Sequence, residues 1–212
     1  MSLSLVIAID GPTASGKGTI ARRLAAIYGL PYLDTGSLYR AVALARLGAG
    51  GSLDDEMAAE QAATMLQPEN IDPAKIRSAE AGAAASVVAA MPKVRAALLK
   101  LQRDFAELPG GAVLDGRDIG TIICPSAPVK IYVTASEDER TRRRLMELNA
   151  AGGDFSFDQV LSQVRARDDR DQNRAIAPAT QAPDAHLLDT SLLSIEAAVE
   201  QARVIVEKAM AQ

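Results

Sequence analysis

The sequence predicts an α/β fold in which a parallel β-sheet is covered by helices on both faces. Short apolar runs rich in β-branched residues alternate with long stretches of helical periodicity, which is the pattern of a buried parallel sheet. The first such run, Leu5–Ile9, leads directly into a glycine-rich turn at 10–16. A composition of 48% apolar and 24% charged residues is ordinary for a globular chain. The 212 residues suit one large domain, or a core domain with a small insertion.

The elements at the start of the chain follow from apolar spacing and from residues that start or end helices. Gly29 is suited to end the first helix, and Gly48 the second. We expect a strand at Leu5–Ile9, a helix at 17–28, a strand at 31–33, and a helix at 36–47 capped by Thr35.

The rest of the chain continues the alternation of strands and helices. Alanine-rich helices dominate from 53 to 108, interrupted by prolines at 68, 73 and 92. Further elements are expected as a strand at 112–114, a strand at 129–133, helices at 136–148 and 157–168, a loop at 175–182, a strand at 186–188 and a helix at 194–210.

Composition excludes several classes of function. Aromatic residues make up 3% and tryptophan is absent, which disfavours base-stacking platforms for single-stranded nucleic acid. The net charge of −4 disfavours a protein that coats a polynucleotide. A single cysteine, Cys124, excludes an internal disulfide, and a single histidine, His186, excludes a multi-histidine metal site. No apolar run reaches the roughly 18 residues of a membrane span, and the first residues do not have the pattern of a signal peptide.

Arginine is concentrated in one segment of the chain. Of the 23 cationic residues 17 are arginine, and eight of these lie between Arg140 and Arg174. The planar guanidinium matches phosphate oxygens, so the excess favours a segment that handles phosphate. A solvated, salt-bridged helix face is the alternative, because Asp168, Asp169 and Asp171 lie in the same stretch.

The motif that carries chemistry is the glycine loop between the first strand and the first helix. Residues Gly11–Lys17 fit the pattern G-x-x-x-x-G-K, in which successive backbone N–H groups form an anion-binding nest and the lysine reaches the β- and γ-phosphates. A fortuitous glycine turn is the alternative. Gly18 follows the lysine and Thr19 comes next, so the hydroxyl expected near magnesium is displaced by one residue. The predicted ATP-binding residues are Gly11, Pro12, Thr13, Ala14, Ser15, Gly16, Lys17, Gly18 and Thr19.

Transfer of a phosphoryl group to a second anionic molecule needs a second anion site. The catalytic work is alignment of the two molecules and neutralisation of their charge. The candidate residues for this site are Arg40, Arg117, Arg167 and Arg174.

Four blocks of sequence resemble those of bacterial cytidylate kinases, and they occur in that family's order. The blocks are Gly11–Thr19, Leu33–Arg40, Asp115–Thr121 and Arg167–Arg174. The resemblance implies a P-loop NTPase-like parallel sheet with a part that binds the nucleoside monophosphate (NMP) and a mobile lid. It also implies transfer of the γ-phosphoryl of ATP to CMP or dCMP with Mg²⁺, in a cytoplasmic monomer that has no nucleic-acid or membrane partner.

The same resemblance implies roles for individual residues. The acceptor phosphate is expected to be bound by Thr35, Arg40, Arg117 and Arg174. The pentose is expected to be bound by Arg167 and Asp171, and the cytosine edge by Ser86, Arg95 and Asp118. Lys17, Arg117 and Arg174 are the expected catalytic residues.

Chemistry supports the assignment of the base-reading residues. Asp118 can accept from the exocyclic amine of cytosine and would repel the carbonyl that uracil presents there. Ser86 lies in an alanine-rich helix, where a purely structural serine is the alternative. Asp115 ends a strand and either orients magnesium through water or caps a turn; the protein ligand of the metal is otherwise not assigned.

The chain departs from the family in the interval before Ser86. Many members have a small antiparallel sheet there, but only 66–77 separates two helical stretches, so we expect a shortened, mostly helical NMP-binding part. The single kinase domain is divided into a core at 1–47, 109–140 and 175–212, an NMP-binding part at about 48–108 and a lid at about 141–174. Closure of lid arginines over the phosphates would exclude water as a competing acceptor.

Two other functions compete with the leading hypothesis. One is a P-loop kinase for another nucleotide or small acceptor. The other is an ATP-binding switch that does not catalyse transfer, for which a second anion pocket would have no use.

Overall fold

The computed structural model describes residues 4–211 and contains a five-stranded, fully parallel sheet with the order β2-β3-β1-β4-β5. This confirms the α/β fold class. The strands are β1 (Leu5–Asp10), β2 (Tyr32–Asp34), β3 (Gly111–Gly116), β4 (Val129–Thr134) and β5 (His186–Asp189).

The register of the sheet brings three of the sequence blocks to one edge. Asp10 pairs with Gly116 across β1 and β3, and Asp34 pairs with Asp115 across β2 and β3. Each of these residues stands at or next to the carboxyl end of its strand. In an open parallel sheet this edge is where ligands bind, so the topology itself assembles the candidate site.

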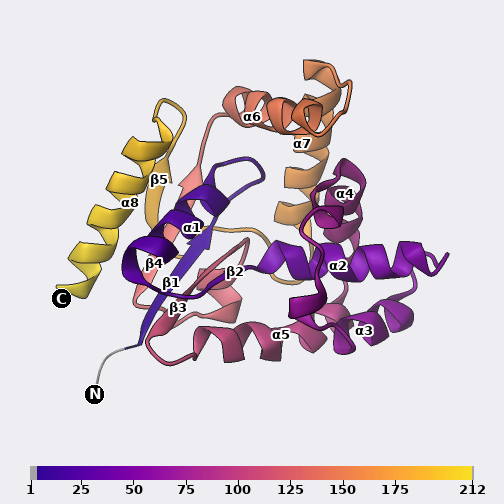
Figure 1. Cartoon of the computed structure of the whole chain (residues 1–212), viewed down its shortest axis with the longest axis horizontal. Coiled ribbons are helices and arrows are strands. Elements are labelled where there is room, and N and C mark those ends of the chain that lie inside the picture. Colours follow the sequence, from indigo (N-terminus) through magenta and orange to yellow (C-terminus); the bar gives the residue numbers. More distant parts are fainter. Residues whose placement is uncertain (1–3, 212) are drawn as a thin grey trace.

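Helices cover both faces of the sheet (Figure 1). On one face, α1 (Lys17–Tyr28) and α8 (Ile195–Met210) pack against β3 and β4 around Ile9 and Leu24. On the other face, α2 (Thr35–Gly48) and α5 (Pro92–Ala106) contact β3.

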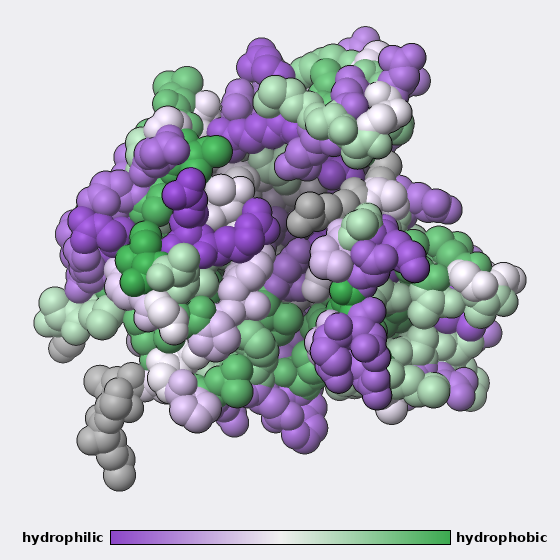
Figure 2. Space-filling view, viewed as in Figure 1, coloured by the Kyte–Doolittle hydropathy of each residue, from purple (hydrophilic) through white to green (hydrophobic). Residues whose placement is uncertain are grey.

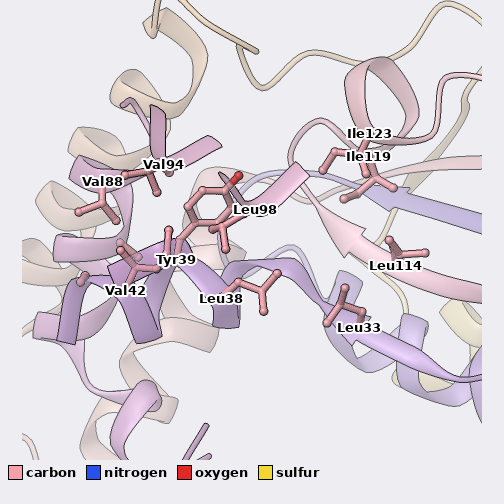
Figure 3. Packing of buried hydrophobic residues seen from close by; sticks show 14 of the residues in the cluster. Leu33, Leu38, Tyr39, Val42, Val88, Val94, Leu98, Leu114, Ile119 and Ile123 are labelled. Atoms are coloured by element: carbon pink, nitrogen blue, oxygen red, sulfur yellow. The ribbon is translucent and has the colours of Figure 1, made fainter. Parts of the chain in front are cut away.

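A single apolar cluster extends from the sheet into the helices at 48–108. Figure 3 shows Tyr39 and Leu98 among the valines of the helical part, with Leu114 toward the sheet. Since α5 packs on both β3 and α3, the cluster leaves no break between this part and the core.

The segment between α2 and β3 is helical, as expected for a chain without the small sheet. Within the described residues it contains helices and 3-10 turns but no strand. Pro68 and Pro92 each begin one of these elements, where the missing N–H costs nothing. The elements are α3 (Glu56–Thr64), η1 (Pro68–Asn70), η2 (Lys75–Arg77), α4 (Ala79–Val88) and α5.

Helices α6 (Glu137–Ala150) and α7 (Phe157–Asn173) form a pair that extends beyond the sheet (Figure 1). Their own small apolar cluster of Leu148, Val160 and Val164 is separate from the two clusters on the sheet. The expected end of α7 at residue 168 was wrong, because the charged run continues as helix for more than another turn.

Two local expectations are corrected by the structure. Asp34, not Thr35, caps α2, since its carboxylate accepts from the Ser37 N–H at 3.2 Å, and the Thr35 hydroxyl is left to donate elsewhere. A π-helical turn, η3 (Ile119–Ile123), was not expected after β3. Asp10 stabilises it by accepting from the N–H groups of Ile119 and Gly120, both at 2.8 Å.

Among the described residues no single helix is long and apolar enough to cross a membrane. One sharply bent pair, Glu80–Val88 with Pro92–Ala106, passes the same length and composition test when its two helices are taken together.

Candidate active site

A cavity opens at the carboxyl edge of the sheet, between the glycine loop and helices α2, α4 and α7. Figure 2 shows a hollow on this face with hydrophilic side chains around it. All nine residues assigned to the acceptor line it, together with Lys17 and five other loop residues: Thr13, Ala14, Gly16, Lys17, Gly18, Thr19, Thr35, Arg40, Ser86, Arg95, Arg117, Asp118, Arg167, Asp171 and Arg174. Gly11, Pro12 and Ser15, also assigned to ATP, do not line the cavity.

The glycine loop has the backbone of an anion nest. Gly16 (φ 89°) and Ala14 (φ 56°) both lie in the left-handed region, so the chain curls back on itself before α1 begins. A side chain at Gly11 would place Cβ 2.0 Å from the Val133 carbonyl oxygen, so only glycine lets the loop leave β1 against β4. Helix α1 begins at Lys17 and its first three residues line the cavity, so the positive end of the helix borders it.

Lys17 and Asp115 both line the cavity, close enough for their charges to interact. Burial and the nearby Arg117 charge lower the pKa of Lys17 to about 7, while burial and the Asp34 charge raise the pKa of Asp115 to about 6. Lys17 donates to the Pro12 carbonyl oxygen at 3.3 Å, and Asp115 accepts from the Tyr32 hydroxyl at 2.8 Å. No backbone N–H of the described residues donates to the Asp115 carboxylate, so it does not cap a turn.

The buried Asp10 carboxylate lies behind this floor. Burial raises its pKa to about 7 despite the two N–H groups that donate to it. Its contacts with η3 tie the end of β1, just before the loop, to the Asp115–Thr121 block.

Thr35 and Arg40 lie on α2 beside the end of β3. The Thr35 hydroxyl donates to the Asp115 carbonyl oxygen at 2.8 Å, and Arg40 pairs with Asp34 at 2.5 Å. Nε of Arg40 is buried and has no hydrogen-bond partner. The Arg40 side chain also lines the cavity, so the guanidinium borders the space that an anion would enter.

A second group of side chains centres on Asp171 of α7, which contacts Ser86 of α4 and the Arg117 side chain. Its carboxylate accepts from the Ser86 hydroxyl at 2.9 Å and from Arg117 Nε at 3.0 Å, while Arg167 Nε lies 3.8 Å away. These cations hold the pKa of Asp171 below its usual value against the opposing effect of burial. Ser86 is thus part of a buried polar network and not an isolated helical serine.

A third group surrounds Asp118. Arg95 pairs with one of its carboxylate oxygens and Arg174 donates to the other at 3.3 Å. Arg95 also lies over the Tyr39 ring at 5.7 Å, and Arg174 Nε donates to the Ala177 carbonyl oxygen at 2.5 Å. Arg174 thus pairs with a residue predicted to read the base, although it was expected at the acceptor phosphate.

Several residues that line the cavity were not predicted. Tyr39 lies inside the Leu33–Arg40 block, and its buried hydroxyl has no partner. Arg22 lies one helical turn after Gly18 on α1, a spacing that could have placed it here. Asp34 lies in the same block as Tyr39, whereas Glu147, which also lines the cavity, had no signal in the sequence analysis.

The lid arginines, which were not assigned individually, have different surroundings. Arg144 lines the cavity, Arg143 donates to the Ser15 carbonyl oxygen at 3.3 Å, and the Arg142 side chain is 60% exposed. Arg142 and Arg165, which pairs with Glu137, thus belong to a solvated, salt-bridged face, the alternative given for this segment, and a role of Arg144 toward phosphate stays a prediction.

The fold and this cavity define a P-loop nucleotide-binding protein with a second cationic site opposite the loop. A sequence model of the family described as cytidylate kinase matches residues 7–208. The chain belongs to the cytidylate kinase family.

Similar proteins support this assignment over nearly their whole length. The chain is 60% identical to the cytidylate kinase of Xanthobacter autotrophicus, covering 96% of this chain and 97% of that protein. The corresponding protein of Bradyrhizobium sp. is 58% identical, with 96% of both chains covered, and that of Caulobacter vibrioides is 54% identical, with 99% of both covered.

One solved structure shares the fold at low sequence identity. An uncharacterized protein from Eubacterium ventriosum matches with a TM-score of 0.57 at 12% identity, covering 97% of this chain and 99% of its own. This likeness bears on the fold alone.

Proposed function

We propose that this chain transfers the γ-phosphoryl group of ATP to CMP or dCMP, giving ADP and CDP or dCDP. One observation carries the proposal: the anion nest and the arginines of three separate sequence blocks line one cavity. Membership of the cytidylate kinase family supports the choice of acceptor. A switch protein would have no use for the second cationic site.

The donor half of the cavity is the loop with the start of α1. Its N–H groups and Lys17 would hold the β- and γ-phosphates of ATP. Thr19 and Asp115 line the cavity as hard oxygen donors of the kind Mg²⁺ prefers, and the Asp115 carboxylate carries no backbone hydrogen bond. These two residues would hold the ion directly or through water, and the bound ion would neutralise charge on the phosphates.

The acceptor half is built from guanidinium groups that carboxylates already orient. Arg40 and Arg117, with Thr35, would take the CMP phosphate, and Arg167 with Asp171 the pentose. Because each arginine is already paired with a carboxylate, it is positioned in advance and loses little freedom on binding.

The base would lie against the Asp118 group. Asp118 and Arg95 are nine-tenths buried, so their hydrogen bonds to the base form away from water. Ser86, the third residue assigned to the base, donates to Asp171, which is assigned to the pentose, and this contact would couple recognition of the base to that of the sugar. Arg174 neutralises Asp118 and would be drawn toward phosphate when the site closes.

Transfer would then require alignment and charge neutralisation only. Lys17 and Arg117 flank the position between the two halves and would balance the charge on the transferred group. We assign helices α6 and α7 to a lid, the helices at 48–108 to acceptor binding, and the sheet to the core. The proposal is for a monomeric enzyme.

The test is ADP release measured with CMP, dCMP, UMP, AMP and GMP as acceptors. We expect kcat/KM for CMP and dCMP to exceed that for AMP and GMP by at least about 10²-fold, since a buried polar site rejects a base that leaves its groups unpaired. Equal use of all acceptors would favour a kinase of broader substrate class. ATP binding without acceptor-dependent ADP release would favour a switch.

Proton uptake on binding of ATP is a further expected result. The pKa of Lys17 is about 7 in the free protein, so above pH 7 the amine is largely neutral and must regain a proton when phosphates raise its pKa. The dissociation constant for ATP should therefore rise by up to about tenfold per pH unit above pH 7.

Calorimetry in buffers of different ionisation enthalpy measures this uptake directly. Lys17→Ala should remove it, while Lys75→Ala, at a side chain 78% exposed, should leave it unchanged. Proton release at pH 8, or uptake that persists in Lys17→Ala, would contradict the assignment to Lys17.

A further inference from the structure

The outer surface of the glycine loop is held by arginines from α6. The carbonyl oxygens of Thr13 and Ser15 accept hydrogen bonds from this helix. Arg140 Nη1 donates to the Thr13 oxygen at 3.3 Å, and Arg143 Nη1 donates to the Ser15 oxygen at 3.3 Å. The Ser15 oxygen also accepts from the Thr190 hydroxyl at 2.9 Å, whereas no other hydrogen bond to the Thr13 oxygen is found among the described residues. The position of the loop at Thr13 therefore depends on where α6 places the Arg140 guanidinium.

Arg140 connects the loop to α7 as well. Its side chain is 9% exposed, its Nε donates to the Ala135 carbonyl oxygen at 3.1 Å, and its Nη1 pairs with the Asp168 carboxylate. The second oxygen of Asp168 is buried without a hydrogen-bond partner. Arg140 thus compensates the buried negative charge of Asp168, and removal of either residue would leave the other charge buried without a partner.

The acceptor site is attached to the same helix less than one turn further on. Asp171 of α7 accepts from Ser86 of α4 and from Arg117, as described above. Asp168 and Asp171 are three residues apart on a rigid helix, so a displacement of α7 moves both. The α6–α7 pair has its own apolar cluster, which lets it move as a unit.

We propose that Arg140 and Asp168 are positioning residues that couple occupancy of the acceptor site to nucleotide affinity at the glycine loop. Acceptor bound at Asp171 and Arg117 holds α7 in one position. Asp168 then holds Arg140 against the Thr13 carbonyl, and the loop keeps the curl that binds phosphate. The second ligand meets an ordered site and binds more tightly. The inference rests on the proposed function for the identity of the two ligands.

A neighbouring ion pair provides the matched control. Arg165 and Glu137 also join α7 to α6, with distances of 2.7 and 3.0 Å. Their side chains are 62% and 38% exposed, and neither contacts the loop. Loss of this pair removes an α6–α7 contact without touching the path from Asp168 to Thr13.

The experiment measures the dissociation constant of ADP by calorimetry, with and without saturating CMP. We expect CMP to tighten ADP binding at least about fivefold in the unaltered protein, within the usual range of coupling. In Asp168→Asn, and independently in Arg140→Lys, the tightening of ADP binding by CMP should fall below about twofold. The dissociation constant of CMP measured without ADP should change less than threefold in these two variants. Arg165→Gln should keep the full tightening of ADP binding by CMP.

The outcomes separate this inference from the proposed function. An unaltered protein that binds ADP and CMP with no coupling overturns the inference and leaves the function intact. Coupling that survives in both Asp168→Asn and Arg140→Lys, or that is lost equally in Arg165→Gln, also overturns it. If one of the two variants fails to fold, as judged by circular dichroism, the other decides. Failure of the unaltered protein to bind CMP at all would instead count against the proposed function.

Discussion

Replacing Lys17 with alanine is expected to lower kcat by about 10³-fold or more while changing the CMP dissociation constant less than threefold. An amine on the transferred phosphates stabilises charge that develops in the transition state, and loss of such a group costs about 4 kcal/mol in a water-excluded site. The acceptor would be held by arginines of α2, α7 and the Asp115–Thr121 block, which this substitution leaves in place.

Steady-state kinetics with CMP and ATP, together with calorimetry of CMP alone, measure the two effects separately. Lys75→Ala removes an exposed lysine of the same charge and should leave both values unchanged. A variant in which kcat is preserved, or in which CMP binding is lost along with it, would contradict the placement of Lys17 at the donor phosphates.

Replacing Asp118 with asparagine is expected to reduce the preference for CMP over UMP by about 10²-fold or more. The carboxylate can only accept, so it matches the exocyclic amine of cytosine, whereas an amide can turn its N–H₂ toward the carbonyl of uracil. The structure favours asparagine over alanine for this test. Alanine would leave Arg95 buried without its partner, at a cost of roughly 3–5 kcal/mol.

The ratio of kcat/KM for CMP and UMP measures the change, and the dissociation constant of ATP serves as its internal control. Asp104→Asn, at a side chain 57% exposed on α5, should alter neither quantity. An unchanged ratio in Asp118→Asn, with ATP binding intact, would show that another residue reads the base.

Much of the fold could be predicted because its signals are local. The alternation of apolar strands with helical periodicity places every strand to within two residues at each end, and the glycine loop is where the motif puts it. The short interval before Ser86 correctly excluded a sheet from the described residues of that part. The end of α7 was misplaced because a run of charges has no apolar spacing from which to judge a helix.

The candidate site was predicted as a set of residues but not as a set of contacts. All five arginines assigned to the acceptor line one cavity. Their partners join residues far apart in the chain: Ser86 and Asp171 are 85 positions apart, and Asp118 and Arg174 are 56 apart. The spacing of residues along the sequence does not indicate which of these distant side chains pair in the fold.

The sequence by itself indicated the α/β class and the glycine loop, because each depends on neighbours a few residues apart. Its resemblance to cytidylate kinases picked out the other blocks, whose residues line the cavity. Only the tertiary structure decided which carboxylate pairs with which arginine. It also decided that Arg140 and Arg143 of α6 donate hydrogen bonds to carbonyl oxygens of the glycine loop. The physical reason is that a guanidinium pairs with whichever oxygen the packed helices bring within reach. That choice is made by the folded backbone and not by the local sequence.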